Sequence, residues 1–78
     1  MNALEFYELA IENAKQTDND ISVGYLYHYS ENAFDNIFVP NALLYFMVDV
    51  YNAYMWADSN ESHVYYEIVV KHLEHIEL

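Results

Sequence analysis

Several residue types are scarce in this 78-residue sequence, and each scarcity excludes a class of structure or chemistry. The chain contains no cysteine, one glycine and one proline. Without cysteine it can form neither a disulfide nor a thiolate metal site, which fits a reducing, cytoplasmic setting. A single glycine excludes the usual phosphate-cradling loops, and the near absence of glycine and proline leaves no linker-like segment. We therefore expect one domain over residues 1–78.

Basic residues are scarce as well. Two lysines face thirteen aspartates and glutamates, so the formal net charge is −11. Such a charge excludes nucleic acid or an anionic membrane as a direct partner, and it favours a basic protein. The alternative is that the acid only keeps an apolar small protein soluble, because 55% of the residues are hydrophobic and nine are tyrosines.

The most apolar stretch, residues 42–57, is interrupted by Asp49 and Asn52 and is shorter than the roughly 20 residues that cross a bilayer. The N-terminal region carries Glu5, Glu8 and Glu12, whereas a signal peptide has a basic start and an apolar run. We therefore expect no membrane association.

The hydrophobic period predicts a helix over residues 3–16, with Asn2 as N-cap and Glu5 completing a capping box. Residues 17–20 then form a turn that caps the next helix. Residues 21–38 are ambiguous, because alternation over 21–29 is typical of a strand. A helix is favoured since its pattern stays in phase for longer, with Ser30 the one polar residue on the apolar side.

After Pro40, residues 41–57 are apolar around most of a helical circumference. Such a helix lies at the centre of a fold or in a subunit interface. The last helix is expected over residues 61–77, with a strand near 64–70 as the rival. The predicted fold is therefore a small all-α, four-helix domain. The alternative is an α+β fold with strands near 21–29 and 64–70.

The sequence lacks the residue spacings of the usual catalytic and metal-binding sites. No serine lies in a glycine-flanked elbow, and two lysines offer little with which to stabilise an oxyanion. His72 and His75 are three residues apart, but on a helical wheel His72 lies on the apolar side and Glu67 and Glu74 lie away from it. We expect no enzyme activity, no metal and no cofactor.

The acids instead form rows. Their spacing of three and four residues along a helix is about 4.5 to 6 Å, close to the roughly 6 to 7 Å between successive phosphates of a nucleic-acid strand. Tyrosines, which are favoured at interfaces, lie among them on the polar side. The predicted partner-binding residues are Glu5, Glu8, Glu12, Asp18, Asp20, Tyr25, Tyr29, Glu31 and Asp35.

This pattern suggests an inhibitor that mimics DNA or RNA and occupies the groove of a basic, nucleic-acid-binding protein. Small acidic anti-CRISPR and anti-restriction proteins of phages are similar in size and charge, without a shared motif. A second hypothesis is an immunity protein or antitoxin that neutralises a basic toxin or nuclease. A third is a self-associating structural or adaptor protein, in which a homodimer forms through the polar seam of the third helix: Tyr45, Asp49, Asn52 and Trp56.

Overall fold

The computed structural model describes residues 1–34, 37–56 and 60–78, without the side chains of residues 60–63 and 65. These residues form four α-helices and a short 3-10 helix: α1 (Ala3–Thr17), α2 (Val23–Ala33), α3 (Asn41–Met55), α4 (Asn60–Lys71) and η1 (His72–His75). Over the same residues there is no strand, and the one β-bridge is an isolated pair between Asn2 and Glu77. The all-α prediction is confirmed, and the alternative with strands near 21–29 and 64–70 is wrong.

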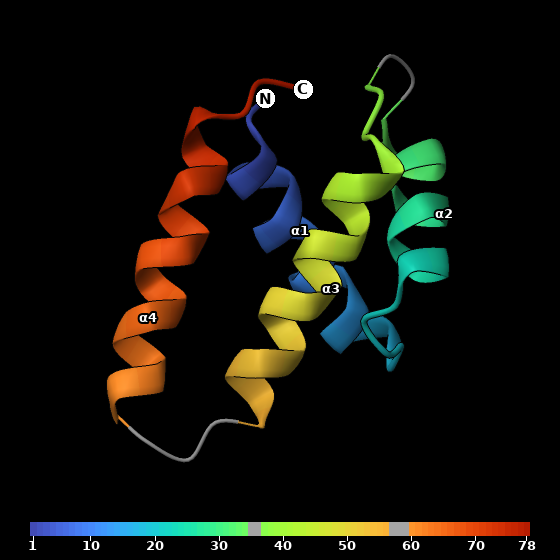
Figure 1. Ribbon diagram of the computed structural model, residues 1–78. Helices are drawn as coiled ribbons and strands as arrows, with labels where there is room; N and C mark the ends of the chain where they lie inside the picture. The colour runs from blue at the N-terminus through green and yellow to red at the C-terminus, as the bar shows by residue number, and fades with distance from the viewer. Residues whose placement is uncertain (35–36, 57–59) are drawn as a thin grey trace.

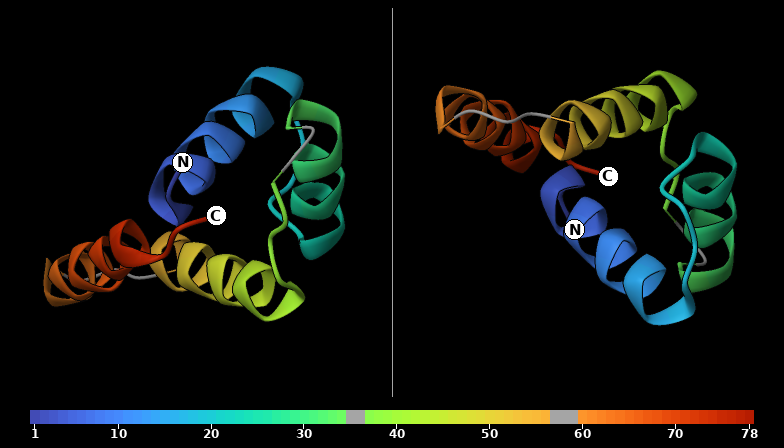
Figure 2. Two further views of the ribbon diagram at one scale, coloured as in Figure 1. Left: turned by 90° about the horizontal axis from the view of Figure 1, so that it is seen from above. Right: turned by 90° about the horizontal axis from the view of Figure 1, so that it is seen from below.

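The helices do not share the core equally. α3 lies between α2 and α4, and α1 lies behind α3 (Figure 1). Seen from above and from below, α1, α2 and α3 surround a common interior, whereas α4 lies to one side, next to α3 (Figure 2). Within the described residues, no helix is long and apolar enough to cross a membrane.

The core is built mainly on α1. Its period of three and four residues directs one face inward, and Ala3, Phe6, Tyr7, Ala10 and Ala14 are all buried. The largest fully buried side chains also come from α2, α3 and η1: Tyr7, Phe6, Leu26, Leu44, Met47 and Leu73.

Local capping explains where α1 begins and ends. The Asn2 side chain accepts a hydrogen bond from the Glu5 N–H (2.8 Å), and Glu5 Oε1 accepts one from the Asn2 N–H (3.1 Å), so the predicted capping box is confirmed. Asp18 ends the helix in the left-handed region (φ 56°), where its N–H donates to the Ala14 carbonyl. The N-cap of α2 is Ser22, two residues beyond the predicted turn.

α2 is shorter than the helix expected over residues 21–38. It ends at Ala33, because Phe34 is extended (φ −137°, ψ 119°) and its ring packs against Phe6 and Tyr29. Phe34 thus contacts the core from a non-helical segment. Val39, in the same connection between α2 and α3, is buried as well. Ser30 is buried as predicted, and its hydroxyl donates to the Tyr27 carbonyl (2.7 Å).

The last helix also departs from the prediction of one helix over 61–77. α4 ends at Lys71 and tightens into η1, after which the chain is extended at Ile76. The two chain ends cause the change by pairing with each other. The Ala3 N–H donates to the Ile76 carbonyl (2.8 Å), and the Leu78 N–H donates to the Met1 carbonyl (3.0 Å).

The rotation of α4 differs from the expected one as well. Val64 and Ile68, expected in the core, are 56% and 57% exposed, and His72 is exposed. Tyr66 packs against the core instead, whereas Leu73, which was also expected on the apolar side, is buried. Since α4 lies beside the core rather than over it, only a narrow side of the helix is covered.

Candidate acidic interface

The outward face of α1 carries the predicted acidic row. Glu5, Glu8 and Glu12 are all exposed, because residues 3, 6, 7, 10 and 14 direct the opposite face into the core. Leu9 lies on this side and is 45% exposed. The placement predicted for these three carboxylates is therefore confirmed.

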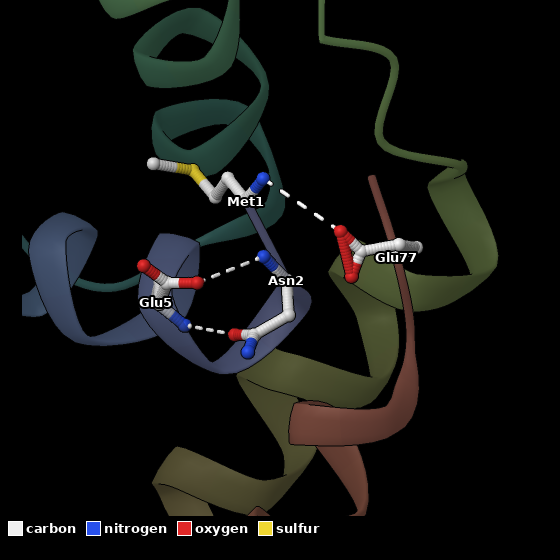
Figure 3. Close-up of polar contacts among 4 residues, drawn as sticks. All are labelled: Met1, Asn2, Glu5 and Glu77. Atoms are coloured by element: carbon white, nitrogen blue, oxygen red, sulfur yellow. Dashed lines mark hydrogen bonds and ion pairs between the residues drawn. The ribbon is translucent and has the colours of Figure 1, made fainter.

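The three glutamates differ in their other contacts. Glu5 forms the capping box with Asn2 (Figure 3). The N-terminal ammonium group of Met1 lies 3.8 Å from the Glu77 carboxylate. Glu12 accepts a hydrogen bond from Gln16 (3.3 Å). A change at Glu5 therefore alters helix capping as well as surface charge, whereas Glu8 and Glu12 can be changed with little structural effect.

A shallow hollow connects α1 to the end of the chain. We call it the acidic groove, and its lining residues are Asn2, Leu4, Glu5, Glu8, Leu9, Glu12, Glu74 and His75. Glu74 joins the three glutamates of α1 because η1 packs against the start of α1. Glu74 is predicted on the polar side of the last helix, but no local pattern of the sequence predicts that this part of the chain packs against α1.

Asp18 and Asp20 are exposed but lie in a different hollow. That hollow runs between the end of α1 and the end of α3, and it also contains Lys15 and Trp56. It shares no residue with the acidic groove. The two aspartates therefore do not extend the acidic row of α1, and the cationic residue Lys15 lines the same hollow.

The placement of Tyr25 and Tyr29 on the polar side of α2 is wrong. Both rings are half-buried against the core. The Tyr25 hydroxyl donates to the Ala10 carbonyl (2.7 Å) and accepts from the Asn13 amide (2.8 Å), so this tyrosine joins α2 to α1. Tyr29 packs against Phe6 with 5.8 Å between ring centroids. Burial of the two large rings is favourable, so Tyr25 and Tyr29 pack against the core although the helical wheel places them on the polar side. Both tyrosines therefore have a structural role.

The remaining acids of the predicted set are on α2 and after it. Glu31 is exposed, and its hydrogen bond with the Tyr27 hydroxyl raises the pKa of that phenol. Asp35 lies outside the described residues. The predicted set is therefore divided over several surfaces: Glu5, Glu8 and Glu12 line the acidic groove, whereas Asp18 and Asp20 line another hollow.

A pair of tyrosines lies behind Glu8. The hydroxyls of Tyr7 and Tyr66 are 2.6 Å apart and form a hydrogen bond between α1 and α4. Burial raises the pKa of Tyr7 strongly, and the bond to Tyr66 adds to it. Burial also raises the pKa of Tyr66, to which the nearby Glu8 carboxylate contributes. Both phenols are therefore neutral at physiological pH and act as structural hydrogen-bonding groups.

The polar seam of α3 faces outward along its whole length. Tyr45 is 61% exposed and Trp56 is 85% exposed, and Asp49 and Asn52 are exposed between them. A carboxylate within so apolar a segment would need a partner if it were buried. The exposure of Asp49 removes that need, because water can solvate the carboxylate.

Among the described residues, no three His, Asp or Glu side chains come together as a metal ion would require. Comparison with known proteins finds no matching family model, no matching curated protein and no matching solved structure. The arrangement of carboxylates on α1 and η1 is thus the main guide to function.

Proposed function

We propose that this chain is a non-enzymatic inhibitor that binds a basic, nucleic-acid-binding protein through the acidic groove. The observation that carries the proposal is the grouping of Glu5, Glu8, Glu12 and Glu74 around one exposed hollow. Four carboxylates meet a single histidine and no lysine there, in a chain of net charge −11. An ordinary solvated helix face mixes both signs.

The groove offers more than charge. Leu4 and Leu9 lie among the carboxylates, so a lysine or arginine side chain could place its apolar stem on leucine and its cationic head on glutamate. The spacing of the acids on α1, about 4.5 to 6 Å, also approaches that of backbone phosphates. A protein groove built for DNA or RNA therefore presents complementary groups.

A pull-down from the native cell followed by charge reversal tests this function. The Glu8→Lys/Glu12→Lys variant should lose the captured partner, and the wild-type chain should compete with nucleic acid for that partner in a salt-sensitive manner. The matched control is Asp20→Lys/Glu31→Lys, which changes the net charge equally outside the acidic groove. Equal losses in both variants would show that general acidity, not this groove, drives binding.

The same experiment separates the toxin-neutralising alternative. A mimic displaces nucleic acid from the partner. An immunity protein that blocks a nuclease while the nucleic acid stays bound would not compete with it. Binding that is insensitive to ionic strength would contradict both forms of the proposal.

A further inference from the structure

A second exposed surface lies along α3 and shares no lining residue with the acidic groove. We call it the aromatic face, and it consists of Phe38, Tyr45, Phe46, Asp49, Asn52 and Trp56. Its four aromatic side chains are 79%, 61%, 39% and 85% exposed in chain order. Large aromatic groups left in water along one helix mark a contact surface rather than a solvated face.

These residues form one continuous surface. Tyr45, Asp49, Asn52 and Trp56 recur at four, three and four residues, which places them on the same side of α3. Phe46 joins that side to α4, because it lines a hollow with Asp49 and Val69 and another with Phe38 and Ile76. The surface therefore extends from the segment before α3, along α3, to the flank of α4.

We propose that the aromatic face binds a second copy of this chain, with the two α3 helices packed antiparallel about a two-fold axis. Charge affects which occupant fits. Two copies that each carry −11 repel one another least where carboxylates are few. Asp49 is the one charged residue of the six, and the face is bordered by the carboxylates of Asp18 and Asp20, beside Asn52 and Trp56, and of Glu77, beside Phe38. A basic partner is drawn instead to the acidic groove, which shares no residue with the aromatic face.

The two-fold geometry also provides for Asp49. It lies near the middle of α3, with Tyr45 one turn before it and Asn52 three residues after it. In an antiparallel pair, residues on either side of the axis face one another. A two-fold axis that passes between Tyr45 and Asp49 thus places the carboxylate of each copy opposite the Tyr45 hydroxyl of the other, which can donate a hydrogen bond to it.

The available area is of the right size. With about 200 Å² for a fully exposed aromatic side chain, the four rings present about 500 Å². A stable interface buries about 800 Å² per partner. The neighbouring Ala42 and Ala53 are exposed and so are Val64 and Ile68 of α4, which supply much of the remainder. Trp and Tyr are the residues that most often dominate binding energy. In the aromatic face Trp56 lies at one end and Tyr45 lies nearer the middle.

Sedimentation equilibrium of the full chain over a micromolar to millimolar series tests this inference. We expect a concentration-dependent mass that approaches twice the 9.3 kDa of one chain. The Tyr45→Glu/Trp56→Glu variant should raise the dimer Kd by at least about tenfold. Leu9→Glu/Tyr27→Glu adds the same charge at exposed residues outside the aromatic face and should reduce dimerisation much less. Circular dichroism verifies that each variant remains helical.

Salt distinguishes this contact from the proposed function. Added salt should strengthen the dimer by screening like charges, whereas it should weaken capture of a basic partner. Glu8→Lys/Glu12→Lys should abolish that capture and leave the dimer intact. A monomer at every concentration and ionic strength would overturn the inference, as would a dimer that Tyr45→Glu/Trp56→Glu leaves unchanged.

Discussion

α1 and α3 are both 15 residues long, yet they treat their outward faces in opposite ways. α1 places its apolar residues inward and three glutamates outward, so its surface is suited to water. α3 buries Leu44, Met47 and Val50 and still exposes Tyr45, and Trp56, the C-cap that follows it, is exposed as well. An acidic outward face is compatible with either solubility or binding. An aromatic outward face has no solubility role, and we interpret it as a contact surface.

The largest expected effect is the loss of a buried side chain of α1. Phe6→Ala removes a fully buried ring in contact with Tyr29 and Phe34, and we expect it to lower the free energy of unfolding by about 3–5 kcal/mol. Chemical denaturation at low protein concentration, where the chain is monomeric, measures this loss.

The matched variant on α3 is Trp56→Ala, which removes the largest side chain of the aromatic face. Because Trp56 is 85% exposed, we expect a change within about 0.5 kcal/mol in the monomer. A loss as large as that of Phe6→Ala would show that the aromatic face stabilises the single chain, and the contrast between the two helices would fail.

The tyrosine pair between α1 and α4 gives the next effect. The pKa of Tyr7 and the pKa of Tyr66 are both raised in the folded chain, so folding stability is fully present below about pH 10, the pKa of an unfolded tyrosine, and falls above it. The expected slope is about 1.4 kcal/mol per pH unit for each phenol that stays protonated.

Denaturation at a series of pH values measures this slope, and tyrosinate absorbance reports the ionisation. Tyr7→Phe removes one of the two phenols and should make the loss shallower. Stability that does not change between about pH 9 and pH 11 would contradict the burial of the pair.

Loss of the α1 cap has a smaller expected effect. It separates the capping contact of Glu5 from the charge of its carboxylate. Asn2→Ala removes the acceptor for the Glu5 N–H, and we expect a loss of about 1 kcal/mol. Partner capture should not change, because the carboxylates of the acidic groove remain. If capture were lost, the conformation of the chain end rather than its charge would control binding.

Local patterns were enough to predict four helices, the capping box and the exposure of the acids on α1. A period of 3.6 residues with charge on one side leaves α1 only one way to face the core. The same reasoning failed for α4, which has apolar residues on two sides. Val64 and Ile68 are no less apolar than Tyr66, so only packing against α3 and α1 decides which side is covered.

Two features of the site depended on contacts between distant residues. Glu74 enters the acidic groove because the chain ends pair with each other, as the bond between Ala3 and Ile76 shows. Tyr25 leaves the surface because its hydroxyl finds the Ala10 carbonyl on α1. Neither partner lies within a helical turn in the sequence, so a wheel drawn for one helix could not include them.

The smallest expected effect bears on why α1 is acidic at all. Glu8 and Glu12 are four residues apart, and like charges at that spacing destabilise a helix. Glu8→Gln/Glu12→Gln should therefore raise the free energy of unfolding by roughly 0.2–0.5 kcal/mol at low salt, and the gain should shrink as salt is added. Thermal denaturation at two ionic strengths measures both.

The control is Asp20→Asn/Glu31→Gln, which removes the same two charges from −11 to leave −9 but relieves no pair on α1. Both variants keep ample charge for solubility. If the first is more stable and as soluble as the wild-type chain but loses its partner, the acidic row costs stability and serves binding. If Glu8→Gln/Glu12→Gln still binds the partner, the acids of α1 serve solubility alone. The outward faces of α1 and α3 would then differ in surface chemistry, and α1 would not carry a binding site.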